Sequence, residues 1–442
     1  MKKNKIIAAL CIVATLMSAC NRVEVLTDTT TYTSADSTLP PVTDESCATE
    51  STDATDITDI TDNTDISDTT DITGDIDVPD EVDPDATFTL TFGGDTALDT
   101  FYGELGNGAL VWGGIEYPFR DVKPIFENSD YTIINLETAV GTEGESEKRY
   151  GFGFLTPPEA LESFTWAGID MMNLANNHTR DFGVEGVELT LSHLKEYGLE
   201  YVGAGMNLDE SRECKIVEKN GIKVGFLAFN LFVSSEGWLA EDDKAGQSAW
   251  TADMYSEYLA DIKKYDSEVD FLVVSAHWGV EETYELTSSQ QSMARLFADN
   301  GADLVIGHHP HVVQGIEYYN GVPIFYSVGN LLFYKLEDML DGISGVFEVT
   351  FHKNGVIDAR IYPVFIGSCR VQLLTEDDEK YNHVLSALGM CSLPFDVGVD
   401  NTGKIIFNYY GNEPILEPVE LVEIDLEGIR NESNQENAEE NE

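Results

Sequence analysis

Short apolar runs that end in polar or charged residues recur along the chain from residue 86 onward. Such runs are typical of buried β-strands, and seven of them are predicted as strands: 88–95, 131–137, 171–178, 223–230, 271–279, 304–311 and 323–330. Between them, apolar residues recur at helical spacing in three segments: 184–198, 252–266 and 287–301. Strands that alternate with helices predict an α/β fold. The β-rich stretches 346–351 and 356–365 are expected to add antiparallel strands.

The first 20 residues have the three parts of a secretory signal: basic MKKNK, an apolar stretch, and small residues before Cys20. The apolar stretch, residues 6–19, is shorter than the roughly 20 residues that a membrane-spanning helix needs. LMSAC resembles the bacterial lipoprotein signal, although Met17 replaces the usual leucine. We expect residues 1–20 to be a signal peptide, with a lipid on Cys20 holding the protein at the extracellular face of the cell membrane. Ordinary secretion after cleavage near Ala19 is the alternative.

Residues 21–85 are rich in threonine and aspartate, and aspartates recur at every third position from Asp53 to Asp71. This composition cannot bury enough apolar surface to offset the entropy of ordering, so an extended, disordered acidic linker is predicted. Calcium binding is the alternative reading, but the repeat lacks the glycine turns that fold carboxylates around an ion. The acidic residues 411–442 are predicted to be a disordered tail.

The whole chain carries a net charge of −55, of which −30 falls on residues 86–410. Such an acidic body repels nucleic acid and anionic membranes, so no nucleic-acid partner is expected. An anionic substrate would have to be held by local cations or by metal ions. Cys214, Cys369 and Cys391 are widely spaced, so at most one internal disulfide is available and a cysteine-based zinc or redox site is not expected.

Polar residues of metal-binding type follow one predicted strand after another. In α/β sheets, ligands bind outside the carboxyl ends of the strands, where the loops converge. Each residue alone has an ordinary explanation, such as a turn, a cap or a core histidine. Their repetition at strand ends favours a shared site, and carboxylates, an amide and imidazoles together suit manganese, iron or zinc. The residues are Asp95, Asn135, Glu137, Asn176, Asn177, His178, Asp181, His277, Glu281, His308, His309, His311, Ser327 and Asn330.

Six motifs in a fixed order carry a family resemblance: GGDT, NLET, NLANNHTRDFG, HWGVE, GHHPHVVQG and YSVGNLLF. They resemble the CapA family of poly-γ-glutamate capsule synthesis proteins, which is itself similar to the calcineurin-like metallophosphoesterases. The resemblance implies that residues 86–410 form one α/β domain with metallophosphoesterase-like stacked mixed β-sheets flanked by helices (αββα). It also implies one or two divalent metal ions at the strand ends.

The resemblance further implies a role for each residue of the set. Asp95 would bind a first metal and Asn177 a second, and His277, His309 and His311 would complete the coordination. His178 would be the general acid, oriented by Asp181. Glu137 would replace an aspartate of the wider superfamily, whose opening DxH is here Asp95-Thr96-Ala97 without the second ligand. The remaining residues are expected to bind substrate: Asn135, Asn176, Glu281, His308, Ser327 and Asn330.

Three functions stay open at this point. The first is a lipid-anchored component of poly-γ-glutamate synthesis or export, with a metal centre that acts on the polymer or on a phosphorylated intermediate. The second is a non-catalytic surface scaffold that binds the polymer. The third is a metal-dependent hydrolase of another envelope substrate. The expected partners are an anionic polymer or phosphorylated substrate, the membrane through the lipid anchor, and other capsule synthesis proteins.

Overall fold

The computed structural model describes residues 86–98, 113–142, 153–232, 238–333, 342–411 and 415–416. These residues belong to one compact unit, Asp77–Glu442. The expected signal peptide with Cys20 and the linker 21–85 lie outside the described residues, as does most of the expected tail 411–442. Within the described part of the chain, no helix has the length and apolar character needed to cross a membrane.

The first sheet joins the start of the domain to its end. β1 (Phe88–Thr96), β2 (Tyr131–Leu136), β5 (Met171–Asn173) and β6 (Glu200–Val202) are neighbours and run parallel. On the other side of β1 lie β16 (Ile343–His352), β17 (Gly355–Gly367) and β18 (Arg370–Leu373), all antiparallel. The short β15 (Asn330–Leu332) pairs with the end of β1 in parallel. The predicted antiparallel strands near residues 346–365 are therefore confirmed.

The second sheet is also mixed. β9 (Ile222–Asn230), β11 (Phe271–His277), β12 (Leu304–His308) and β14 (Val322–Phe325) are parallel neighbours. β8 (Lys215–Lys219) and β13 (Ile316–Tyr319) close the two edges in antiparallel pairing. Parallel central strands are buried on both faces, which explains why their sequences are nearly continuous apolar runs.

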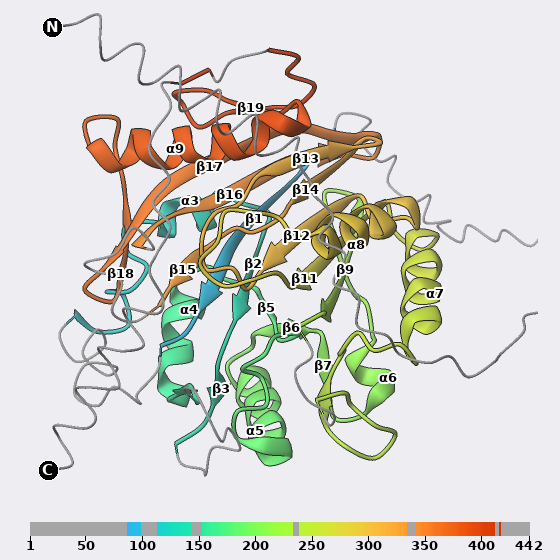
Figure 1. Cartoon of the computed structure of the whole chain (residues 1–442). Helices are drawn as coiled ribbons and strands as arrows, with labels where there is room; N and C mark the ends of the chain where they lie inside the picture. Colours follow the sequence, from blue (N-terminus) through green and yellow to red (C-terminus); the bar gives the residue numbers. More distant parts are fainter. Residues whose placement is uncertain are drawn as a thin grey trace, which may run out of the picture. The chain divides into compact units, whose positions relative to one another are not determined.

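The side chains of successive strand residues point to opposite faces of each sheet. Phe88, Leu90 and Phe92 of β1 pack between the two sheets with residues of β9, β11 and β12. The outer face of the first sheet packs on α3 (Lys123–Glu127), α4 (Leu161–Ala167) and α5 (Gly183–Glu196). The outer face of the second packs on α7 (Tyr255–Asp266) and α8 (Ser288–Asp299) (Figure 1). The αββα arrangement is therefore confirmed.

Smaller elements complete the domain. α9 (Glu379–Ser392) lies along β17 and also contacts β13 and β16 (Figure 1). The predicted helices correspond to α5, α7 and α8, whereas α4 and α9 were not predicted. The other elements are β3 (Ala139–Val140), β4 (Leu155–Thr156), η2 (Pro158–Ala160), β7 (Ala204–Gly205), α6 (Leu208–Ser211), β10 (Gly246–Gln247), η4 (Leu393–Phe395), β19 (Gly398–Val399) and β20 (Ile405–Ile406).

Three predicted strands end three or more residues earlier than the sequence pattern suggested. β5 stops at Asn173 and β12 at His308, and the predicted strand 323–330 is divided into β14 and β15. The reason for the division is that residues 326–329 cross from the second sheet to the first. On that path the N–H of Val328 donates to Gly307 O, and the N–H of Asp95 donates to Gly329 O.

Glycines permit this crossing. A Cβ on Gly307 would lie 2.0 Å from the carbonyl oxygen of Tyr326, and a Cβ on Gly94 would lie 1.8 Å from that of Gly329. No side chain fits at either position, because both contacts are with backbone atoms. The crossing segment therefore lies directly on β1 and β12, next to the residues predicted to form the site.

An aspartate precedes each of four parallel strands and joins it to its neighbour. Asp130, Asp170, Asp270 and Asp303 stand directly before β2, β5, β11 and β12. Each carboxylate accepts the backbone N–H of a residue in the adjacent strand, at 2.8–2.9 Å. Each aspartate N–H also donates to the carbonyl of that same residue. The four pairs of hydrogen bonds fix the register of the strands at the end opposite the predicted site.

Asp303 gives this arrangement a measurable pH dependence. Burial, together with the nearby charge of Asp266, raises the pKa of Asp303 to about 6. The hydrogen bond from the Leu272 N–H lowers this pKa, but its effect is smaller. The folded state therefore retains a proton that the unfolded state releases, and the free energy of unfolding falls as pH rises from about 4 to about 6. Asp303→Asn keeps an acceptor for Leu272 and removes this titration. We expect it to stabilise the protein by about 1–2 kcal/mol at pH 8 and to leave stability unchanged below about pH 4.

Urea unfolding at several pH values measures this difference. Asp303→Ala is the control, because it removes the acceptor as well and should destabilise the protein at every pH. Equal stability of Asp303→Asn and wild type at pH 8 would contradict the assignment.

Candidate metal site at the strand ends

The carboxyl ends of the parallel strands bring the predicted residues together in register. Asp95 of β1 lies beside Asn135 of β2 and Asn330 of β15. His277 of β11 lies beside His308 of β12. Since the two sheets stack face to face, the carboxylates of one sheet meet the imidazoles of the other at this end. The meeting point is buried, and Asp95, Glu137 and His277 have no exposed surface.

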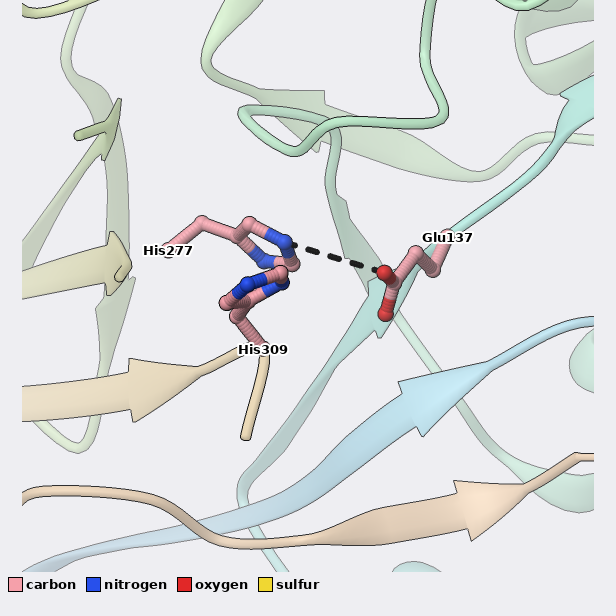
Figure 2. A group of neighbouring side chains, drawn as sticks. All are labelled: Glu137, His277 and His309. Carbon is pink, nitrogen blue, oxygen red and sulfur yellow. Dashed lines mark ion pairs between the residues drawn. The ribbon is translucent and has the colours of Figure 1, made fainter. Parts of the chain in front are cut away.

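Glu137, the residue after β2, is common to two groups of metal-binding side chains. Glu137, His277 and His309 form one group, and Asp95, Glu137 and His311 form the other. Within each group the ligand atoms lie within 4.8 Å of one another. Figure 2 shows the rings of His277 and His309 side by side, facing the Glu137 carboxylate, with Glu137 Oε1 3.7 Å from His277 Nε2. Glu137 would therefore be a ligand in either donor group.

Asp95 joins the histidine loop to the first sheet. Its Oδ1 accepts a hydrogen bond of 2.7 Å from the side chain of Asn135, and its Oδ2 accepts the backbone N–H of His309 at 3.1 Å. The Nδ1 atoms of His308 and His311 lie 3.4 and 3.2 Å from its oxygens. Burial alone would raise the pKa of Asp95, but these imidazoles hold it well below its usual range. The carboxylate is therefore in the ionised form that a metal requires.

The segment after β12 has an unusual backbone that aims its histidines at Glu137 and Asp95. His309 has φ of 98° and His311 has φ of 60°, both in the region that residues other than glycine seldom adopt. The N–H of Glu282 donates to Pro310 O, and Asn330 contacts both the ring and the carbonyl of His311. Left-handed backbone at two of three successive residues is characteristic of functional sites. It also ends the strand at His308, earlier than predicted.

The loop after β5 supplies an amide and a histidine–aspartate pair. Asn177 Oδ1 lies 2.9 Å from His277 Nε2. His178 Nδ1 lies 2.7 Å from Asp181 Oδ2, and its Nε2 lies 3.9 Å from Glu137 Oε1. The same Asp181 oxygen accepts the backbone N–H of Phe154 at 2.8 Å. His178 is thus fixed on one nitrogen while the other points toward the shared carboxylate.

The electrostatics of the imidazoles differ across the site. Burial, and then the charge of His309, lower the pKa of His277 well below its usual value. Burial also lowers the pKa of His311, but the negative charges of Glu137 and Asp95 outweigh this effect and raise the pKa to about 10. Neutral His277 has the form that a metal ligand needs. In the absence of an ion, protonated His311 offsets part of the carboxylate charge.

The donor set fits one or two divalent ions. Ligand atoms around a metal at about 2.1 Å are separated by roughly 3–4 Å, and the distances between donors of Asn177, His277 and Glu137 fall near this range, at 2.9 and 3.7 Å. Carboxylates, imidazoles and an amide suit borderline-to-hard ions such as manganese, iron or zinc. Asn177 would join the group of Glu137, His277 and His309.

Several residues expected to bind substrate make hydrogen bonds to other residues of the protein. Asn135 donates to Asp95 and accepts from Asn176, whose oxygen in turn accepts the backbone N–H groups of His178 and Thr179. Ser327 donates to Val312 O. These contacts favour a role in holding the ligands, and the same applies to His308 and Asn330, which face Asp95 and His311. Glu281 is half-buried and its charge acts on His311.

Three phenylalanines that the sequence reasoning did not single out also lie at the site. Phe154, Phe232 and Phe333 pack on the rings of His178, His309 and His311 respectively. A search for metal ligands does not select phenylalanine. The available signal was position, since Phe333 ends the YSVGNLLF motif and Phe232 lies two residues after the end of β9.

A family model described as bacterial capsule synthesis protein PGA_cap matches residues 89–335 of the chain. The match covers more than half of the sequence and contains every residue of the site described above. The chain belongs to the PGA_cap family. The matched segment ends after β15, so β16–β20 and α9 lie beyond it.

Two curated proteins are similar to this chain in sequence. The capsule biosynthesis protein CapA of Bacillus anthracis is 33% identical over 252 residues, which are 55% of this chain and 59% of that protein. The PGA biosynthesis protein CapA of Bacillus subtilis is 30% identical over 311 residues, covering 67% of this chain and 79% of that protein. The matched part of the chain thus spans less than two thirds of the first relative's length.

Solved structures give a weaker likeness. A hypothetical protein from Thermus thermophilus aligns at a TM-score of 0.41 with 16% identity, over 63% of this chain and 100% of that one. A phosphatase from Mycoplasma pneumoniae aligns at 0.39 with 14% identity, over 63% of this chain and 94% of that one. TM-scores and identities this low are no evidence for the reaction of this chain.

Metal content tests the donor set directly. We expect the full chain, purified and reconstituted with manganese, to hold about one to two equivalents of metal by elemental mass spectrometry. His309→Ala/His311→Ala removes one imidazole from each donor group and should lose most of that metal. The double variant His352→Ala/His383→Ala, which removes two histidines outside the site, is the matched control and should keep it. Equal metal in both double variants, or none in wild type, would contradict the assignment.

Proposed function

We propose that this PGA_cap protein takes part in the synthesis or export of poly-γ-glutamate at the cell surface, and that its metal site hydrolyses a bond in the polymer or in a phosphorylated intermediate. Family membership and the two CapA relatives support the pathway. One observation carries the hydrolytic part: the His178–Asp181 pair points toward Glu137, which two donor groups share.

The donor groups define which residues would hold the ions. Asp95, Glu137 and His311 would hold one, and Glu137, Asn177, His277 and His309 would hold the other. A divalent ion in this position supplies a Lewis acid and lowers the pKa of water. Asn135 and His308 keep Asp95 in place for this role, because both contact its carboxylate.

His178 would deliver the proton to the leaving group. Asp181 accepts from Nδ1 and so fixes the ring, which leaves the proton to be carried at Nε2, on the side of Glu137. The Phe154 N–H also donates to Asp181 and holds the carboxylate against the ring. A general acid in this position contributes about 10²–10⁴-fold to a hydrolytic rate.

Charge supports a site that relies on bound cations. Residues 86–410 carry a net charge of −30, and an acidic surface repels a glutamate polymer or a phosphate. Within the site, the contacts of Asp95 are with imidazoles and amides rather than with lysine or arginine. An anion would therefore be attracted by the ions and by the histidines around them.

The cellular arrangement is part of the same proposal. Residues 1–19 would be removed, which leaves the lipidated Cys20 at the N-terminus, and residues 21–85 would hold the domain 86–410 away from the outer face of the cell membrane. Residues 411–442 would form an acidic tail. This arrangement would place the domain where it can contact a growing polymer and other capsule synthesis proteins.

Replacing His178 separates a hydrolase from a polymer-binding scaffold. In the metal-reconstituted chain, His178→Ala should lower kcat for hydrolysis of phosphoester or γ-glutamyl substrates by about 10²–10⁴-fold. Its metal content should stay at the wild-type level, because the residue is not in either donor group. Steady-state kinetics and elemental mass spectrometry on the same samples measure both quantities.

The control is His193→Ala, which changes a histidine of α5 that pairs with Glu196 on the helix surface. It should leave kcat and metal content unchanged. A wild-type protein that binds metal and polymer but hydrolyses neither class of substrate would contradict the enzymatic proposal and favour the scaffold.

A further inference from the structure

Three half-buried phenylalanines surround the imidazoles of the site. The ring centroid of Phe154 lies 4.4 Å from that of His178, Phe232 lies 4.3 Å from His309, and Phe333 lies 5.0 Å from His311. Phe154 and Phe333 also touch each other edge to face, at 5.7 Å. The three rings come from distant parts of the sequence, and each packs on a different imidazole of the same site. We call Phe154, Phe232 and Phe333 the aromatic collar.

Backbone hydrogen bonds hold two of the three collar residues, Phe154 and Phe232, in position. The N–H of Phe154 donates to Asp181, the partner of His178. The N–H of Phe232 donates to the side chain of Asn230 and to the carbonyl of His277. Asn230 is itself held by Gln247. The backbone bonds that position these two rings are therefore made to residues of the site or to residues beside it, so the rings and the metal ligands keep a fixed relation.

The position of the collar suits contact with carbon atoms. Phenylalanine offers neither a hydrogen bond to an anion nor a ligand to a metal, and each collar residue keeps part of its surface exposed. A site that recognised only a small anion would be surrounded by hydrogen-bond donors. An apolar rim around a charged centre instead fits a ligand whose anionic group is followed directly by hydrocarbon.

We propose that the aromatic collar binds the methylene carbons next to an anionic group held at the metal site. The inference rests on the proposed function, in which the occupant is a γ-linked glutamyl chain. Each unit of that chain places two methylene groups between an α-carbon with its carboxylate and the next amide. The collar would thus select a chain by hydrocarbon contact, which adds affinity without adding charge to an acidic domain.

Two alkyl phosphates of equal charge isolate this contact. Titration calorimetry on the manganese-reconstituted full chain would compare n-butyl phosphate with methyl phosphate, and then a γ-linked glutamyl oligomer. Wild type should bind butyl phosphate about tenfold more tightly, since burying a methylene contributes up to about fourfold and the contact is partial. Phe154→Ala, Phe232→Ala and Phe333→Ala should each reduce this preference and weaken oligomer binding by about 3–10-fold.

Metal content and affinity for methyl phosphate are measured as well, because both would fall in the variants if the collar residues only supported the fold. Both should stay within about twofold of wild type in the collar variants, and conservative Phe232→Leu should retain most of the butyl preference. Phe407→Ala is the matched control, because Phe407 is half-buried and stacks on Tyr318 in the second sheet. It should leave every value unchanged.

The outcomes distinguish the collar from the proposed function. Equal affinity of wild type for the two esters, or binding of neither, would overturn the collar. The same holds if the variants lose methyl phosphate affinity or metal to the same extent as butyl phosphate affinity. A butyl preference that depends on the collar, without binding of the glutamyl oligomer, would support the collar and contradict the polymer as substrate.

Discussion

The buried carboxylate of Glu137 is the group on which the site depends. Removing a carboxylate from water is costly unless charged or hydrogen-bonding partners replace the solvent. In this structure the imidazoles of His178, His277 and His311 approach it within 4.0 Å, and they come from β11 and from the loops after β5 and β12. Such a cluster is stable in water only where protons or metal ions balance its charge, and its donor geometry allows both.

The rest of the domain aligns the two sheets around this cluster. At one end of the strands, four aspartates fix the register of parallel neighbours through paired hydrogen bonds. At the other end, residues 326–329 cross between the sheets against Gly94 and Gly307. The crossing brings Asn330 to His311 and Asp95, so the connection between the sheets is also part of the site. Fold and chemistry therefore depend on the same contacts.

The sequence predicted much of this arrangement because two signals coincided. Apolar runs located the strands, and polar residues at their ends located the site, since parallel strands must end together. The pattern overestimated the lengths of β5, β12 and β14, because it could not register the left-handed backbone at His309 and His311 or the crossing after Phe325. The pattern also could not distinguish a residue that positions a metal-binding side chain from one that contacts the substrate. The hydrogen bonds of Asn135 to Asp95 and of Ser327 to Val312 O were known only from the structure.

The sequence pattern did not select the three phenylalanines of the collar, because a phenylalanine is linked to a site only through the residues it packs against. The central proposal is that Glu137 belongs to the ligand set of a divalent-metal site, and anomalous diffraction from crystals grown with manganese tests it most directly. The account predicts one or two peaks beside the Glu137 carboxylate, among Asp95, Glu137 and His311 or among Glu137, His277 and His309. A single peak away from Glu137, or none, would contradict it.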